Sequence, residues 1–144
     1  MKKLLLVLTI VGLVFVGCGK VDKKPEYNYM EAKQSAEAIR SGAKVVFVDI
    51  QEKDDFEEEH LKGAIATYSY PVKTQEESDK LLASLKHINS DDKIVIVCPR
   101  GGGGAQRAYD VFAKNGIEKS RLYILTDGQY GWPRDTINDV LVQE

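Results

Sequence analysis

An apolar run that ends at a cysteine and leads into a run of glycines constrains this chain more than any other segment. Residues 94–97 are all Ile or Val, Cys98 follows them, and residues 101–104 are four consecutive glycines. A continuous β-branched run is typical of a strand that is buried on both faces. From residue 105 the apolar residues recur at helical spacing, up to residue 115. The segment predicts a buried strand, a cysteine at its carboxyl end, a glycine loop and a helix.

This order of elements has a chemical consequence for the cysteine. Glycines allow the backbone to approach a ligand closely, and the N–H groups of such a loop and of a helix start can bind an anion. The same field is expected to favour the thiolate form of Cys98, and Arg100 adds a fixed positive charge. The alternative is a buried cysteine beside a flexible turn, but a turn would not require four glycines. We therefore predict that Cys98 is a reactive nucleophile.

Helices and apolar strands alternate along the rest of the chain. The β-branched and aromatic run 45–48 predicts a second strand that is buried on both faces. This alternation favours an α/β fold in which helices cover both faces of a central parallel sheet. Ligands of such sheets bind beyond the carboxyl ends of the strands, where Cys98 is placed. The remaining predicted elements are helices at 30–41, 54–59 and 76–88 and strands at 63–66 and 121–125.

The N-terminus predicts export and a lipid anchor. After a short basic start, residues 4–16 are nearly all apolar, which is too short to span a bilayer but suits a signal peptide. Residues 15–18 resemble a bacterial lipobox, in which Cys18 is lipidated and becomes the first mature residue. Ordinary signal cleavage and an uncleaved anchor are the alternatives. We expect a signal peptide at 1–17, a tether at 18–27 and a domain at 28–144, held on the extracytoplasmic or periplasmic face of a bacterial membrane.

Cysteine and charge content narrow the function further. The chain has two cysteines, so a lipidated Cys18 would leave Cys98 without a disulfide partner, as a reactive thiol. His60 and His87 are far apart, no Cys/His pair has metal-ligand spacing, and we expect neither a metal nor a cofactor. Without residues 1–17 the net charge is −4, and no basic patch suggests nucleic-acid binding.

Several segments, taken in order, resemble the rhodanese-like family over about residues 28–134. The resemblance implies an α/β fold with a five-stranded parallel sheet, and sulfur transfer through a cysteine persulfide. The segments that carry it are 48–50, Phe56, 60–64, 94–97 with Cys98-x-x-Gly101, Gly116, 127–128 and 131–133.

The resemblance also implies roles for individual residues. The Cys98 thiolate would attack the outer sulfur of thiosulfate or of another sulfane donor, and a thiol, cyanide or a protein would accept that sulfur. His60 lies in a segment that is structural in the family, and Tyr130 and Trp132 are expected to line the fold or the rim of the pocket. The anion and then the persulfide would be bound by the loop residues Arg100, Gly101, Gly102, Gly103, Gly104 and Ala105.

Two departures from the family pattern leave the substrate open. Gln51 stands where the family often has Arg. Gly116 lies 18 positions after Cys98, one more than in the short-loop sulfurtransferases, and we place the extra residue among the four glycines. A longer loop resembles the phosphatase and arsenate-reductase relatives, but Gly104 occupies the position of their Cys-x5-Arg arginine. An arsenate- or phosphate-directed enzyme and a non-catalytic binding module are therefore the alternatives to a sulfurtransferase.

Overall fold

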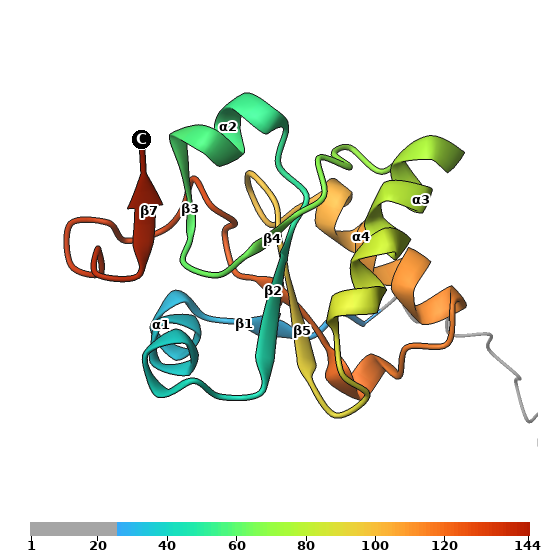
Figure 1. Ribbon diagram of the computed structural model, residues 1–144, viewed down its shortest axis with the longest axis horizontal. Helices are drawn as coiled ribbons and strands as arrows, with labels where there is room; N and C mark the ends of the chain where they lie inside the picture. Colours follow the sequence, from blue (N-terminus) through green and yellow to red (C-terminus); the bar gives the residue numbers. More distant parts are fainter. Residues whose placement is uncertain (1–25) are drawn as a thin grey trace, which may run out of the picture.

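A computed structural model describes residues 26–144 of the chain (Figure 1). Short strands alternate with helices, as the apolar pattern predicts. The elements are, in chain order, β1 (Tyr29–Met30), α1 (Ala32–Ser41), β2 (Val45–Asp49), α2 (Lys53–Glu58), β3 (Glu59–Leu61), β4 (Ile65–Ala66), α3 (Gln75–Leu82), the 3-10 helix η1 (Ala83–His87), β5 (Lys93–Val97), α4 (Gly103–Lys114), the 3-10 helix η2 (Lys119–Arg121), β6 (Leu122–Leu125) and β7 (Leu141–Gln143).

The central sheet has five strands in the order β1-β6-β5-β2-β4, and every neighbouring pair is parallel. The strand that precedes Cys98, β5, lies in the middle between β2 and β6. The predicted α/β fold with a five-stranded parallel sheet is confirmed. Because the strands are parallel, the segments that follow β2, β5 and β6 meet at one edge of the sheet, and this edge carries Cys98.

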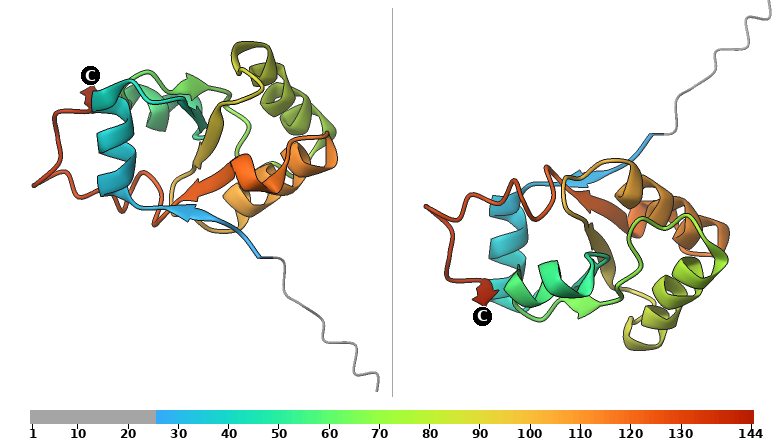
Figure 2. Two further views of the ribbon diagram at one scale, coloured as in Figure 1. Left: turned by 90° about the horizontal axis from the view of Figure 1, so that it is seen from below. Right: turned by 90° about the horizontal axis from the view of Figure 1, so that it is seen from above.

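Alternate residues of β5 pack on opposite faces of the sheet. Ile94 and Ile96 belong to a core that includes residues of α3 and α4, whereas Val95 and Val97 belong to a second core with residues of α1 and the C-terminal segment. Figure 2 shows α1 on one side of the sheet and α3 and α4 on the other. These four residues of β5 are fully buried, which is why they lack the apolar–polar alternation of a half-exposed strand.

Some predicted boundaries differ from the structure. Residues 29–30 form the edge strand β1, so α1 begins at Ala32 rather than at residue 30. The predicted helix 76–88 is divided into α3 and η1. A small antiparallel sheet of β3 and β7 was not predicted, because its strands are 80 residues apart and only their pairing makes either recognisable. This sheet brings the C-terminal strand next to the segment that follows β2.

Within residues 26–144, no helix is long and apolar enough to cross a membrane. The predicted signal peptide, the lipidation site Cys18 and most of the predicted tether lie outside the described residues.

Candidate active site

Cys98 lies directly after β5 and is 2% exposed. The N–H group of Gly101 donates a hydrogen bond to its Sγ atom over 2.9 Å. Further backbone N–H groups, those of Arg100, Gly102 and Ala105, also act on the sulfur. The loop and the first turn of α4 therefore surround the thiol with N–H donors, as the glycine pattern predicts.

The net effect on the thiol differs from the prediction. Burial raises the pKa of Cys98, while the N–H groups of Gly101, Arg100, Gly102 and Ala105 lower it, and burial is the larger effect. The expectation that this field favours the thiolate is therefore wrong, because burial outweighs it. The sequence indicates the donors but not the depth at which the sulfur lies. The N–H groups remain available to stabilise negative charge on Sγ or on an atom bonded to it.

The glycine run does not form one long loop. Gly103 and Gly104 belong to the first turn of α4, so the loop covers only residues 98–102. The predicted helix start at residue 105 is therefore wrong by two residues. Gly101 has a φ of +72°, which favours glycine, whereas Gly102 has a φ of −102°. A Cβ atom at Gly102 would meet no atom within 4 Å, so this glycine is not required by packing of the protein itself.

Gly104 packs closely against the ring of Tyr70. A Cβ atom on it would lie 2.8 Å from Cε2 and 2.9 Å from Cδ2 of the Tyr70 ring. Tyr70 follows β4 in the chain and also lines the pocket around Cys98. An arginine at position 104 would displace this ring. Gly104, which occupies the position of the Cys-x5-Arg arginine, is thus part of a packed contact between α4 and the segment after β4.

The turn after β6 supports the loop from the other side. The N–H of Gln129 donates to the Cys98 carbonyl oxygen over 2.8 Å, and the N–H of Tyr130 donates to that of Pro99 over 2.9 Å. Gly128 has a φ of +65°, and a Cβ atom on it would lie 2.4 Å from the Cys98 carbonyl oxygen. The sequence suggested a turn here, but not that this turn holds the backbone of the cysteine loop.

A pocket of about 480 Å³ opens above Cys98 and carries charges of both signs. The exposed Arg100 places its guanidinium carbon 6.0 Å from the centre of the Tyr130 ring. The Tyr130 hydroxyl donates to the Asp55 carboxylate over 3.0 Å. The sequence indicated Arg100 and Tyr130 but missed the other rim residues, which are Glu52, Asp55 and Tyr70. These come from α2, its start and the segment after β4, and no local pattern distinguishes them.

Two other candidates lie away from Cys98. His60 stacks on the ring of Phe56, with ring centres 3.9 Å apart, and its Nδ1 donates to the Phe56 carbonyl oxygen over 2.7 Å. Trp132 is buried in the second core, and its Nε1–H donates to the Ile137 carbonyl oxygen. Both contacts are structural. Within residues 26–144, no group of three or more His, Cys, Asp or Glu side chains is placed to hold a metal ion.

The substitution of Gln51 for the family's Arg changes a buried carboxylate. Asp49 is fully buried and accepts hydrogen bonds from the Gln51 backbone N–H over 2.9 Å and from its Nε2 over 3.0 Å. These donors are neutral, so burial dominates and raises the pKa of Asp49 to about 7. The carboxyl group stands at the end of β2, beside the cysteine strand.

The sheet of five parallel strands, with a buried cysteine in a cradle of N–H groups at its carboxyl edge, places the chain in a class of α/β domains with a cysteine loop after the central strand. Residues 31–135 match the model of the Rhodanese-like domain, and the chain belongs to this family. No curated protein matched the chain.

Solved structures share the fold at low sequence identity. The chain resembles a rhodanese-related protein from Thermoplasma volcanium, with 17% identity, a TM-score of 0.59, and coverage of 82% of this chain and all of that one. The rhodanese-like domain of an Anabaena protein has 13% identity and a TM-score of 0.62, with coverage of 83% and 81%. The As–Sb reductase of Leishmania major has 17% identity and a TM-score of 0.58, with coverage of 81% and 85%. At these identities the likeness concerns the fold.

Proposed function

We propose that the protein is a sulfurtransferase or sulfane-sulfur carrier that works through a persulfide on Cys98. The observation that carries this proposal is the position of the sulfur: it ends the central strand and accepts an N–H bond from Gly101 inside a pocket. Membership of the rhodanese-like family fits a sulfurtransferase-type or related function.

The proposed first step forms the persulfide. The Cys98 thiolate attacks the outer sulfur of thiosulfate, or the terminal sulfur of a polysulfide. A new Sγ–S bond forms, and the donor's S–S bond breaks with its electron pair leaving on sulfite or on the shortened polysulfide. The N–H groups around Sγ hold the negative charge of the terminal sulfur. Because burial raises the thiol pKa, we expect the rate of this step to rise with pH through and above neutrality.

The second step regenerates the Cys98 thiolate. An acceptor thiolate, or cyanide, attacks the outer sulfur, and the bond to Sγ breaks with its electron pair leaving on Cys98. The thiolate is then ready for another donor, and no external oxidant or reductant is needed. Arg100 is the cation at the pocket rim that we assign to orienting an anionic donor.

Arsenate- or phosphate-directed chemistry receives less support from this pocket. Such enzymes of the fold clamp the oxyanion with an arginine at the position of Gly104. Here a Cβ atom at that position would lie 2.8 Å from the Tyr70 ring, so a side chain there requires the ring to shift. The nearest cation along α4, Arg107, donates through its Nε to the Pro71 carbonyl oxygen, and its Nη1 lies beside Gly103, 3.0 Å from where a Cβ atom on that glycine would be.

The activity is tested by following sulfite release from thiosulfate in the presence of cyanide or a thiol, with Cys98→Ser as the matched variant. We expect turnover by the wild type and none by the variant, since the serine hydroxyl cannot form a persulfide. Equal rates in the two proteins would refute the proposal. Hydrolysis of aryl phosphates or reduction of arsenate without sulfite release would favour the alternative chemistry. If sulfite release and both of these activities were absent, a non-catalytic binding module would be favoured.

We further propose that Cys18 anchors the domain to the outer face of the membrane. The test is fractionation of cells that express the wild type or Cys18→Ser. The wild type should sediment with membranes and carry lipid on Cys18, and the variant should be released or remain unprocessed. A wild type that is exported in soluble form with an unmodified Cys18 would contradict this proposal.

A further inference from the structure

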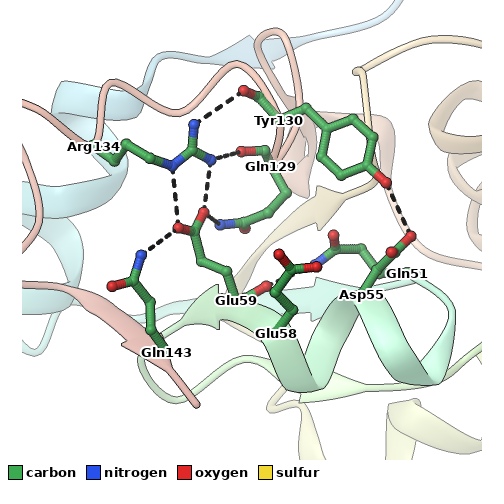
Figure 3. A pocket seen from close by; sticks show the side chains of 8 residues that line it. All are labelled: Gln51, Asp55, Glu58, Glu59, Gln129, Tyr130, Arg134 and Gln143. Carbon is green, nitrogen blue, oxygen red and sulfur yellow. Dashed lines mark hydrogen bonds and ion pairs between the residues drawn. The ribbon is translucent and has the colours of Figure 1, made fainter.

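A second cavity adjoins the Cys98 pocket. It has a volume of about 320 Å³, and Asp55 and Tyr130 line both cavities. The hydrogen bond between these two side chains therefore stands at the boundary between them. We call the second cavity the side pocket. Figure 3 shows its lining, which comes from the segment after β2, from α2 and β3, from the segment after β6 and from β7.

Two buried acceptors without partners lie in the wall of the side pocket. Gln51 and Gln129 are each 1% exposed, and the Oε1 atom of each has no hydrogen bond within residues 26–144. The amide nitrogens are already engaged: Nε2 of Gln51 donates to Asp49 and to the Glu59 carbonyl oxygen, and Nε2 of Gln129 donates to the Glu59 carboxylate. A buried acceptor without a donor costs free energy. What the pocket lacks is therefore a hydrogen-bond donor.

The charges of the side pocket point to a cation. Glu59 is neutralised, because Arg134 donates to its two carboxylate oxygens over 3.1 and 2.7 Å, and this contact holds the pKa of Glu59 at about 2. Asp55 accepts only from the neutral Tyr130 hydroxyl among the residues of Figure 3, and no interaction is drawn to Glu58. Two carboxylates thus remain uncompensated around two unpartnered carbonyl oxygens. This set matches a nitrogen cation with several N–H donors, an ammonium or a guanidinium group.

We propose that the side pocket binds the cationic nitrogen of the sulfur acceptor, which is therefore an aminothiol. This inference rests on the proposed function. The donors of the first step are anions, which the acidic side pocket repels, so the pocket serves the second step. With its nitrogen held by Gln51, Gln129 and the carboxylates, the acceptor passes Tyr130 and presents its thiolate to the outer sulfur of the Cys98 persulfide. The new S–S bond forms on the acceptor, and the electron pair of the old bond returns to Cys98.

The test compares acceptors of equal length that differ in charge. The Cys98 persulfide is prepared with polysulfide, and its reaction is followed with aminohexanethiol and with mercaptohexanol, and with the shorter pair cysteamine and mercaptoethanol. Each rate is expressed per thiolate, because an ammonium group close to a thiol lowers the pKa of that thiol. We expect the amine to react with a second-order rate constant about tenfold higher in at least one pair, the effect of hydrogen bonds from a charged donor to free acceptors. The pair that shows the preference reports the distance between the two pockets. Equal rates in both pairs would overturn the inference while leaving the persulfide, and with it the proposed function, intact.

Two variants of α2 distinguish binding of the amine in the side pocket from its attraction to the net negative charge of the surface. Glu58→Gln removes a carboxylate that lines the side pocket, and Glu57→Gln makes the same change one residue away, at a side chain that pairs with Lys53. We expect Glu58→Gln to lose most of the preference for the amine and Glu57→Gln to retain it. An equal loss in both variants would mean that only the net charge of the surface matters, and would overturn the inference.

The inference can also fail separately from the proposed function. Aminohexanol, which has the ammonium but no thiol, is titrated into Cys98→Ser protein, and the side-chain amide NMR signals of Gln51 and Gln129 are recorded. Shifts of these signals that saturate with the amine, and not with hexanediol, would support the site even if no persulfide formed. Unchanged signals would overturn it even if the protein proved to be a sulfurtransferase.

Discussion

Replacing Gly128 by alanine tests how the cysteine loop is held. The new Cβ would lie 2.4 Å from the Cys98 carbonyl oxygen, 2.6 Å from the Arg100 nitrogen and 2.7 Å from the Gly101 nitrogen. All three atoms belong to the backbone, so no flexible side chain can move aside. We expect a loss of about 1 kcal/mol from the positive φ of the residue and a further 1–3 kcal/mol from overpacking.

Gly42 provides the matched control for this variant. Its φ of +64° is almost the same as the +65° of Gly128, but a Cβ on it would meet nothing within 4 Å. Gly42→Ala should therefore lose only the conformational part, about 1 kcal/mol. The difference between the two variants isolates the contact of the turn with the cysteine loop.

The assay is unfolding in urea, combined with sulfur transfer measured where each variant is folded. Gly128→Ala should have the lower unfolding midpoint and, because the N–H groups around Sγ are displaced, reduced turnover in the folded state. Gly42→Ala should keep full turnover. If Gly128→Ala were as stable as Gly42→Ala and fully active, the turn after β6 would not support the loop.

Three further substitutions test other parts of the account. Gly102→Val should leave the urea midpoint close to that of the wild type, since a Cβ there meets no protein atom. It should lower the rate of sulfur transfer by about tenfold or more, because the donor and the loop backbone approach each other closely. Full activity would contradict the predicted anion cradle. Arg100→Ala should raise KM for thiosulfate more than for a neutral organic trisulfide, and equal changes would remove Arg100 from donor binding. The Asp49 pKa of about 7 lies above the value of 3.8 expected when unfolded, so the folded state binds the proton more tightly and stability should fall as pH rises from about 4 to 7. Asp49→Asn should remove this decline and be more stable at pH 8 by an amount on the order of a few kcal/mol, and identical pH profiles of unfolding would show that Asp49 is not buried as described.

Local sequence patterns were sufficient for the framework of the fold. The apolar runs 45–48 and 94–97 are so continuous that only strands buried on both faces suit them, and parallel pairing follows from the helices between them. The position of Cys98 at the edge of the sheet follows in turn. The glycine after α1, Gly42, ends that helix in the left-handed conformation, as its position indicated.

Other features depend on contacts that no local pattern reveals. The start of α4 was missed because Gly103 and Gly104 suggest a loop, whereas the Tyr70 ring packs on Gly104 within a helical turn. The pKa of Cys98 was expected to fall because the N–H donors are visible in the sequence and the burial is not. The side pocket was missed entirely, because it requires the pairing of β3 with β7 and brings Gln51 close to Gln129.

The most direct test of the central proposal is the intact mass of the protein after incubation with thiosulfate or polysulfide. The account predicts that the wild type gains the mass of one sulfur atom, that peptide mapping places this atom on Cys98, and that an added thiol or cyanide removes it. Cys98→Ser should gain nothing under the same conditions. A wild type whose mass does not change, or an added sulfur that persists in Cys98→Ser, would contradict the proposal that this domain transfers sulfur through a Cys98 persulfide.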